Sequence, residues 1–422
     1  MTNKVCIIAG KRIPFMRSST KYMGVPLREL IKPAMDSLIE ELKLEGKELG
    51  EVSMGAVNKH AYDFALAREI VLDSKLSPST PATDLQKACG TSLETIILVG
   101  NKIALGQIEC GIAGGADTNS DVPIEFKKNF SDRLLKLSAA KDFGGRLKAL
   151  AGFSPSELVP KLPAIKEART GKSMGESCEE MAKTWKISRE AQDQLAYISQ
   201  QNASKAYDEG WFDDSVVEFK GAKKDGILRT APLEKLAKLK PAFDKESGKG
   251  TLTAANSTAL TDGASCVFLC SEQYAKENKL TPMAYLTYVQ SAAVNFIEDE
   301  GLLMAPAYAV PKMLKKAGIT LQDFDFYEIH EAFAAQVLCT LEAWKSEEFC
   351  KEKLGLDTAL GEIDHAKLNI KGGSLALGHP FAATGGRIVT GLAKLLHEKG
   401  SGRGLISICT AGGMGVTAIL EK

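Results

Sequence analysis

The sequence predicts an α/β protein whose layered core consists of two similar halves with a loop-rich insertion between them. Short apolar runs alternate with longer segments of helical periodicity along the whole chain, which is the pattern of βα units. Two regions far apart in the chain also repeat one order of turn, helix and strand. The length of 422 residues exceeds the size at which one hydrophobic core keeps growing, so two or three packed units are expected.

The first repeated region begins at a polar turn with Cys89, and the second begins at a turn with His379. Each turn leads into an amphipathic helix and then into an apolar strand closed by paired glycines. The apolar helix positions are 93, 96, 97, 103 and 104 in the first region and 388, 389, 392, 395 and 396 in the second. We interpret the regions as copies of one βα plan with a shared site between them. Chance similarity of two common helix–strand units is the alternative.

The insertion is predicted by a stretch rich in lysine and glycine. Its clearest element is a helix from Ser188 to Tyr207, for which Ser188 supplies the N-cap. The chain therefore divides into an N-terminal half at 1–121 with 251–275, an inserted loop domain at 122–250, and a C-terminal half at 276–422.

One part of the insertion, residues 126–150, is strongly basic. It carries seven basic residues against two acidic ones, a local net charge of +5 in a neutral chain. Its apolar residues recur at near-helical spacing, so two short amphipathic helices broken at Gly144 and Gly145 are expected. Such helices suit an anionic membrane surface or an acidic partner.

Composition narrows the class of protein. Lysine plus arginine (53) equals aspartate plus glutamate (53), which removes the global electrostatic reason to expect a nucleic-acid partner. No stretch approaches the roughly 20 apolar residues of a membrane span, and the N-terminus lacks the features of a signal peptide. Nine scattered cysteines suggest reduced thiols in the cytoplasm instead of disulfides or zinc ligands.

Two residues form a candidate nucleophile–base pair. Cys89 lies where a polar turn meets the start of a helix, whose free N–H groups would stabilise a thiolate. His379 lies in a turn of small residues ahead of Pro380 and is suited to accept the thiol proton. A buried apolar cysteine and a structural turn histidine are the alternative interpretations.

Two further residues lie at strand ends. His330 follows an alternating strand and precedes a helix, a corner at which α/β sites are usually assembled. Cys409 ends an apolar strand and is followed by a glycine-rich turn whose N–H groups can bind an oxyanion. Each has an ordinary alternative, a polar corner residue and a buried strand-end cysteine.

The segments that carry these residues occur in one order along the chain and together resemble the four signature blocks of the thiolase family. The blocks are the Cys89 segment, His330–Phe333, Gly378–Pro380 and Cys409–Gly415. Further thiolase-like segments are Ser173–Gly175, Ala254–Thr258 and Thr261–Ala264. The resemblance spans nearly the whole chain and implies the layered α-β-α-β-α core of thiolases, with the loop domain binding coenzyme A.

The resemblance also implies an activity, which is cleavage or formation of the carbon–carbon bond of a 3-ketoacyl thioester. Cys89 would carry the acyl group, His379 would deprotonate it, Cys409 would deliver a proton to carbon, and His330 with His379 would stabilise the enolate oxygen. Backbone N–H groups of Cys89 and Ala411 would form an oxyanion hole. The implied contacts to coenzyme A or the acyl chain are Met174, Thr258 and Phe333. Coenzyme A and acyl-CoA are implied as substrates, with no metal and no permanently bound cofactor.

Three positions depart from the usual thiolase pattern. Many thiolases have asparagine in place of His330, and the histidine form resembles the β-subunit of fatty-acid oxidation trifunctional complexes. Ala411 stands at a position that is usually glycine. Thr258 stands where a serine near the pantetheine of coenzyme A is common.

Resemblance to that β-subunit implies partners as well. A homodimer or tetramer paired through a sheet edge is expected. A hydratase–dehydrogenase α-subunit and a peripheral membrane contact are the implied partners of the basic segment. The alternative for that segment is a solvated hairpin packed over the coenzyme A entrance.

Two other functions fit part of this pattern. A decarboxylating ketoacyl synthase resembles this fold but typically works with one cysteine and two histidines, so Cys409 argues against it. A non-catalytic acyl-CoA-binding scaffold would be expected to have lost a reactive residue, and all four positions are filled.

Overall fold

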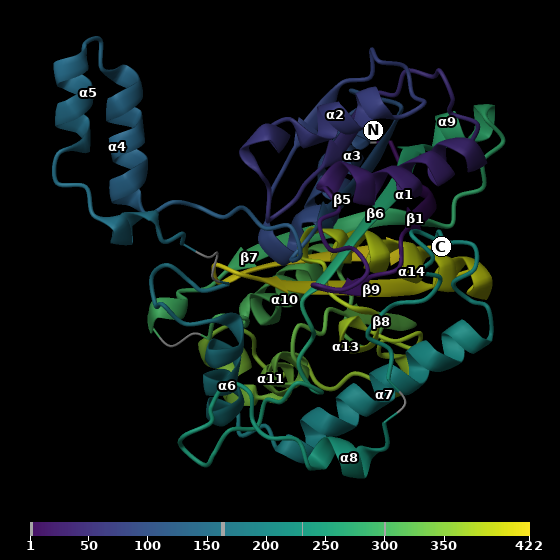
Figure 1. Ribbon diagram of the computed structural model, residues 1–422. Helices are drawn as coiled ribbons and strands as arrows, with labels where there is room; N and C mark the ends of the chain where they lie inside the picture. The colour runs from purple at the N-terminus through teal and green to yellow at the C-terminus, as the bar shows by residue number, and fades with distance from the viewer. Residues whose placement is uncertain (1–2, 162–164, 230, 299–300) are drawn as a thin grey trace.

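The computed structural model describes residues 3–161, 165–229, 231–298 and 301–422 (Figure 1). Its strands are β1 (Val5–Arg12), β2 (Met16–Arg17), β3 (Glu51–Met54), β4 (Ala82–Asp84), β5 (Cys110–Asp117), β6 (Thr261–Ser271), β7 (Ala284–Ala293), β8 (Phe326–Ile329), β9 (Arg403–Thr410) and β10 (Met414–Glu421). Its α-helices are α1 (Leu27–Glu41), α2 (Leu66–Asp73), α3 (Thr91–Ala104), α4 (Lys128–Ala139), α5 (Phe143–Leu150), α6 (Met174–Thr184), α7 (Arg189–Asp208), α8 (Leu233–Ala237), α9 (Glu272–Glu277), α10 (Ala305–Ala317), α11 (Ala334–Lys345), α12 (Glu347–Glu352), α13 (Ser374–Leu377) and α14 (Thr384–Lys399).

The strand order contains the predicted duplication. Strands follow one another as β4-β3-β5-β6-β1-β7-β10-β9-β8, with β2 attached to β6. In the first half β3 and β5 are parallel, whereas β5, β6 and β1 pair antiparallel. In the second half β8 and β9 are parallel, whereas β9, β10 and β7 pair antiparallel. The halves therefore repeat one topology, and a short antiparallel pairing of β1 with β7 joins them.

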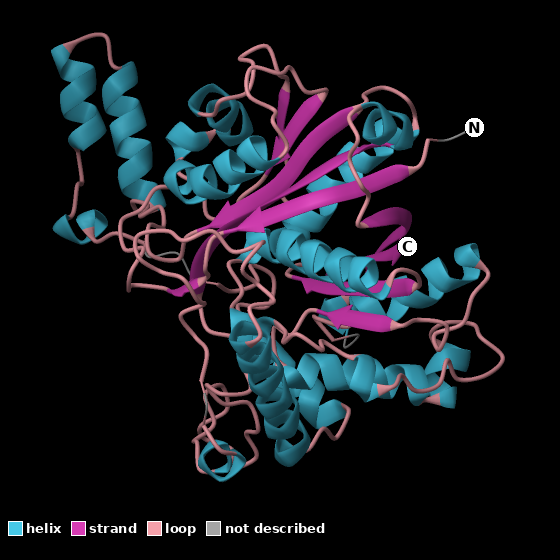
Figure 2. Ribbon diagram, turned by 90° about the vertical axis from the view of Figure 1, so that its right-hand side faces the viewer, coloured by secondary structure: helices cyan, strands magenta, loops and turns pink. Residues whose placement is uncertain are grey.

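Helices and strands form five layers. Helices lie between two groups of strands in Figure 2. The apolar faces of α3 and α14 share one core with β1, β6, β9 and β10, which places these two helices in that central layer. Helices α1 and α2 cover the outer face of the first half, and α10 and α11 cover the outer face of the second. The predicted α-β-α-β-α order is confirmed. Strands β1, β5, β6, β9 and β10 are almost completely buried, whereas β7 stays largely exposed or half-buried.

The paired glycines of the first repeat have a different place from the predicted one. Gly114 and Gly115 lie inside β5 instead of closing it. A Cβ at Gly114 would collide with the carbonyl oxygen of Ser265, and one at Gly115 with that of Ala382. The glycines therefore let β5 approach β6 and the turn after His379, whereas Gly412 and Gly413 do form a turn, with φ of 78° and 68°.

The insertion leaves the core between β5 and β6, and its exact boundaries stay a prediction. The predicted helix at Ser188 is confirmed as α7, with the Ser188 side chain accepting from the Ala191 N–H. In the basic segment, α4 and α5 form a hairpin, but its break precedes Gly144 and Gly145. Asp142 accepts from the Gly145 N–H at 2.6 Å and begins α5, so both glycines lie in its first turn.

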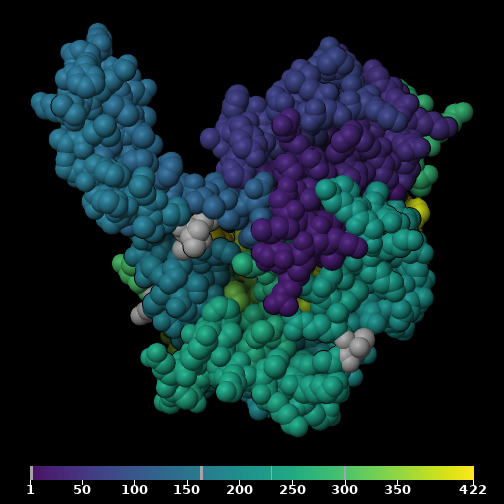
Figure 3. Space-filling view, in the orientation of Figure 1, coloured from purple at the N-terminus to yellow at the C-terminus, as the bar shows by residue number. Residues whose placement is uncertain are grey.

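The α4–α5 hairpin projects from the body of the molecule (Figures 1 and 3). Arg133 fastens its base through an ion pair with Glu157 at 2.7 Å. Every residue of α4 keeps part of its surface exposed. The large apolar side chains exposed on and beside the hairpin are Phe126, Leu134, Leu135, Phe143, Leu147, Leu150 and Phe153. The hairpin is solvated, as one alternative predicted, but it points away from the body instead of packing over it.

Bilayer-crossing helices were sought in the described part of the chain. None of its helices combines the length and the apolar composition that crossing would need.

Candidate active site

Cys89 lies in a strained turn at the start of α3. The short 3₁₀ turn η2 (Ala88–Gly90) leads directly into the helix, and Ala88 adopts a positive φ of 44°. A non-glycine residue rarely adopts this conformation, and such outliers cluster at functional sites. The Thr91 hydroxyl holds the turn by accepting from the Lys87 N–H at 2.9 Å and donating to the Ala88 carbonyl at 2.7 Å.

The Cys89 thiol is neutral in the free protein. Burial raises its pKa to about 12, although backbone N–H groups of Ala411 and of Cys89 itself oppose the shift. The sequence predicted that the helix start would favour a thiolate. Burial outweighs that effect because a charge loses its hydration in the interior.

His379 is held by two threonines. Its backbone N–H donates to Thr261 Oγ1 at 2.8 Å, and its Nδ1 lies 2.6 Å from Thr384 Oγ1. Gly378 precedes it with φ of 99°, a conformation that suits glycine. Burial, together with the positive charge of Arg387, lowers the pKa of His379 to about 3, so the imidazole is neutral and able to accept a proton.

His330 packs beside His379 and is completely buried. It lies at the predicted corner between β8 and α11, and the two imidazole rings are 4.1 Å apart between centroids. Nδ1 of His330 contacts Ser374 Oγ at 2.8 Å, whereas its Nε2 has no hydrogen-bond partner within the described part of the chain. Burial, His379 and Arg387 hold the pKa of His330 well below its usual value, so this ring is also neutral.

The predicted chemical groups converge. The Cys89 sulfur and one nitrogen of each histidine lie within 4.8 Å of one another. Cys409, on β9, is buried beside them, and burial with the nearby Cys89 raises its pKa well above the usual range. Sulfur and imidazole ligands also suit zinc, so a site without a metal stays a prediction.

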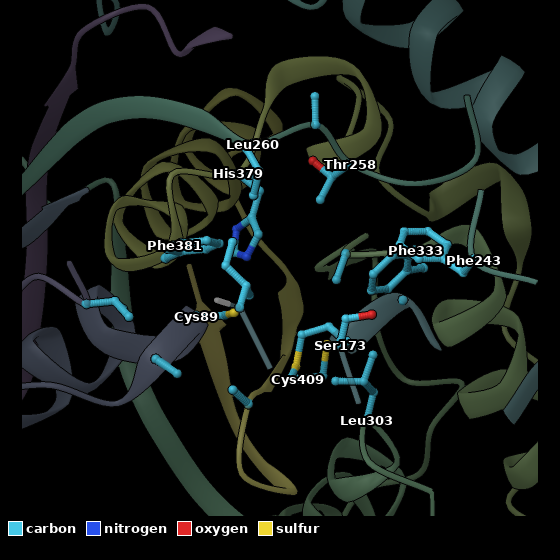
Figure 4. A pocket seen from close by; sticks show the side chains of 18 residues that line it. Cys89, Ser173, Phe243, Thr258, Leu260, Leu303, Phe333, His379, Phe381 and Cys409 are labelled. Carbon is cyan, nitrogen blue, oxygen red and sulfur yellow. The ribbon is translucent and has the colours of Figure 1, made fainter. Parts of the chain in front are cut away.

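An apolar cavity of about 300 Å³ opens at these groups (Figure 4). Predicted residues that line it are Cys89, Met174, Thr258, Phe333, His379, Cys409 and Ala411. His330 is fully buried and is not among the lining residues, although its ring packs against that of His379. The structure adds Ile165, Phe243, Leu260, Leu303 and Phe381 to the wall, residues without a local motif that could have identified them. Thr258 uses its hydroxyl to hold the carbonyl of Ser374 at 3.1 Å.

Asp117 supports the site and was missed by the sequence analysis. Its buried carboxyl group accepts from the N–H groups of Val57, Asn58 and Ala382 at 2.7–3.1 Å. Burial raises its pKa to about 7. It thereby fastens the loop at Val57 and the turn after His379 around Cys89. The sequence feature that could have identified Asp117 is an acidic residue at the end of an apolar strand, here β5.

Comparison with known proteins agrees with this geometry. The thiolase N-terminal domain matches residues 5–273, and the thiolase C-terminal domain matches residues 280–422. The chain belongs to the thiolase family. A 3-ketoacyl-CoA thiolase of Pectobacterium carotovorum is 41% identical over 99% of this chain and 97% of its own length, and one of Shewanella loihica has the same values.

Solved thiolase structures have the same fold. Human mitochondrial 3-ketoacyl-CoA thiolase superposes with a TM-score of 0.82 at 27% identity, covering 100% of this chain and 99% of the human chain. A structure of that human enzyme in complex with CoA has the same TM-score and identity and covers 98% of the human chain. Bacillus anthracis acetyl-CoA acetyltransferase gives a TM-score of 0.81 at 28% identity, covering 100% of this chain and 99% of the other.

The raised pKa of Cys89 predicts an unusual pH profile for its alkylation. Iodoacetamide should modify Cys89 slowly, with a rate that rises about tenfold per pH unit from pH 6 to 9.5, because the thiolate is the reactive form. Peptide mass spectrometry can follow Cys89, which is the one cysteine of nine that is not fully buried. The urea-unfolded chain is the control and should level off near its ordinary thiol pKa. A plateau below pH 8.5 in the folded protein would contradict a buried neutral thiol.

Proposed function

We propose that this thiolase cleaves 3-ketoacyl-CoA with coenzyme A, or runs the reverse Claisen condensation, through an acyl-Cys89 intermediate. The observation that carries the proposal is the convergence of the Cys89 sulfur with nitrogens of His330 and His379 within 4.8 Å, at the wall of an apolar cavity. A neutral thiol beside a neutral imidazole is the starting state for nucleophilic acyl transfer.

In cleavage, His379 takes the proton of the Cys89 thiol as the sulfur attacks the 3-keto carbon. This role needs an unprotonated Nε2, which requires that Nδ1–H donate to Thr384 Oγ1. The oxygen of the attacked carbonyl gains negative charge. Backbone N–H groups of Cys89 and Ala411, which already contact the sulfur, are the donors for it.

The intermediate collapses by breaking the bond between C2 and C3 of the substrate. Its electron pair leaves on the acetyl-CoA enolate, and Cys409 delivers a proton to that carbon. The high pKa of Cys409 keeps the thiol protonated and ready to donate. Coenzyme A then attacks the acyl group on Cys89 as its thiol proton passes to the Cys409 thiolate. The bond between Cys89 and the acyl carbon breaks, and the Cys89 sulfur takes back the proton held by His379, so that acyl-CoA and acetyl-CoA leave. The CoA complex of the human relative supports coenzyme A as a substrate here.

The cavity supports contacts to the acyl-CoA from the predicted residues. Met174, Phe333 and Thr258 lie in its wall with Phe243 and Leu303. Apolar lining suits the pantetheine arm and an acyl chain. A ketoacyl synthase would leave Cys409 without a role. A non-catalytic scaffold would leave the strained Cys89 turn unexplained.

Two features of the structure support a cellular compartment and an oligomeric state for this protein. All nine cysteines are unpaired thiols, which supports a reducing compartment such as the cytoplasm. Strand β4 lies at the end of the strand order and pairs only with β3 among the described strands. We propose that a second copy covers this edge in a homodimer or tetramer.

The α4–α5 hairpin suits an anionic surface. It combines a local net charge of +5 over residues 126–150 with large exposed apolar side chains such as Phe143 and Leu147, which are 80% and 62% exposed. We propose that the hairpin binds peripherally to an anionic membrane. A hydratase–dehydrogenase subunit is the alternative partner.

The activity predicts loss of the enolate absorbance of acetoacetyl-CoA when the protein and coenzyme A are added. Cys89→Ser should abolish both this loss and the acyl adduct detected by mass spectrometry, because a hydroxyl is hardly ionised by a neutral histidine. A full acyl adduct at the substituted position would refute the assignment of the nucleophile. Release of carbon dioxide from malonyl-CoA instead would favour the synthase.

Replacing Cys409 should separate the two chemical steps. In Cys409→Ala, acylation of Cys89 by acetyl-CoA should stay within about threefold of the unmodified protein. Carbon–carbon cleavage and exchange of the acetyl-CoA methyl protons should fall at least about 10³-fold, because no group then moves the proton at carbon. Proton NMR in deuterium oxide measures the exchange. Unchanged exchange would mean that another group is the base.

The hairpin predicts sedimentation with anionic vesicles at low salt and release at raised salt, because screening weakens the attraction. Phe143→Ser combined with Leu147→Ser should reduce the bound fraction several-fold. Leu105→Ser, an equally exposed leucine at the end of α3, is the matched control and should have no effect. Failure to bind anionic vesicles at low salt would leave only the partner subunit for this surface.

A further inference from the structure

A buried chain of hydrogen bonds lies behind His330. Arg387 on α14 donates from Nη2 to Ser374 Oγ at 2.8 Å, and the same oxygen lies 2.8 Å from His330 Nδ1. The three side chains come from α14, α13 and the corner after β8, and all three residues are buried. Ser374 has no role in the chemistry described above, and Arg387 acts there only through the effect of its charge on the pKa values of the two histidines.

The donors and acceptors available in these three side chains determine which atom donates in each hydrogen bond. A guanidinium group only donates, so Ser374 Oγ accepts from Arg387. The hydroxyl has one proton of its own, and His330 Nδ1 is its other recorded partner among the described residues. A proton on Nδ1 would leave two buried groups unpaired, the Ser374 hydroxyl as a donor and Nε2 as an acceptor, whereas a proton on Nε2 leaves only that N–H unpaired. Ser374 therefore donates to Nδ1, and the neutral ring carries its proton on Nε2.

We propose that Arg387 and Ser374 are positioning residues that hold His330 in the tautomer with the proton on Nε2, so that this N–H donates to the thioester oxygen of the substrate. The inference rests on the proposed function for the identity of that oxygen. Nε2 of His330 has no hydrogen-bond partner among the described residues, and its ring packs beside His379, which lines the cavity together with Cys89. The N–H is therefore left for a ligand that enters the cavity. A ligand oxygen at this position is negatively charged in the enolate and less so in the thioester, so the hydrogen bond strengthens along the reaction.

The two histidines thereby receive different roles from their neighbours. His379 Nδ1 lies 2.6 Å from Thr384 Oγ1, and its base role requires that Nδ1–H donate there, which leaves the Thr384 hydroxyl proton for another acceptor. At His330 the Ser374 oxygen accepts from Arg387, and the Ser374 hydroxyl proton goes to Nδ1. The carboxyl group of Glu331 stabilises the corner by accepting from Ser199 at 2.7 Å, from Asn369 at 2.6 Å and from the Leu375 N–H at 3.1 Å.

Nitrogen NMR of the whole protein labelled with ¹⁵N-histidine tests the tautomer directly. The chain has only five histidines, so each signal can be assigned by single substitution. His330 should show a protonated Nε2 and an unprotonated Nδ1 at neutral pH. A protonated Nδ1 would overturn the proposal without any reference to activity.

Three substitutions then test the positioning role. Ser374→Ala should shift the His330 signals towards a mixture of tautomers and slow methyl-proton exchange and cleavage by about tenfold to a hundredfold. Acylation of Cys89, which uses the other oxyanion donors, should change less than about threefold. Ser374→Thr keeps the hydroxyl and should restore the tautomer. Ser53→Ala removes a buried serine hydroxyl on β3 that has no recorded partner and should leave both readouts unchanged.

The outcomes separate the two proposals. Equal losses of acylation and exchange in Ser374→Ala, with an unchanged His330 tautomer, would show a merely structural role and overturn the positioning proposal. A protonated Nε2 that depends on Ser374, in a protein without thiolytic activity, would overturn the proposed function and leave the tautomer assignment standing.

Discussion

Helices α3 and α14 touch at their first turns, where Gly385 lies against the backbone of Leu93 and the Gly386 N–H donates to Ser92 Oγ at 2.8 Å. A side chain at Gly385 would separate the helices. The turn with Cys89 precedes α3, and the turn with His379 precedes α14. This contact therefore brings the reactive turns of the two halves together, and the sheets on either side hold the helix pair in place.

Burial between the layers sets the chemistry of the site. It keeps the thiols protonated and the imidazoles neutral by shifting the pKa values of Cys89 and Cys409 up and those of His330 and His379 down. Neutral partners can exchange protons with a substrate without separating full charges beforehand. The remaining polarity of the site comes from backbone N–H groups and from the guanidinium group of Arg387, whose pKa burial lowers from its usual value.

The hairpin and the core have opposite physical characters. Core helices such as α1 and α14 bury a continuous apolar face, whereas α4 and α5 leave large apolar groups in water. A protein surface rarely keeps such groups exposed without a binding role. The hairpin is attached at its base through Arg133 and Glu157, so changes at its tip can alter binding without disturbing the distant catalytic turns.

The sequence by itself determined the features that depend on neighbours along the chain. These are the duplicated turn–helix–strand plan, the α7 cap at Ser188, the turns that present Cys89 and His379, and the strand end that carries Cys409. Tertiary structure decided what depends on distant residues. The Asp117 carboxyl group contacts the Ala382 N–H across 265 positions in the chain, and Ser374 meets His330 across 44. The pKa of Cys89, expected to favour the thiolate, is reversed by burial among both halves. The local sequence predicts the helix start that would stabilise a Cys89 thiolate. Only the packing of the layers determines how much water remains to solvate that thiolate.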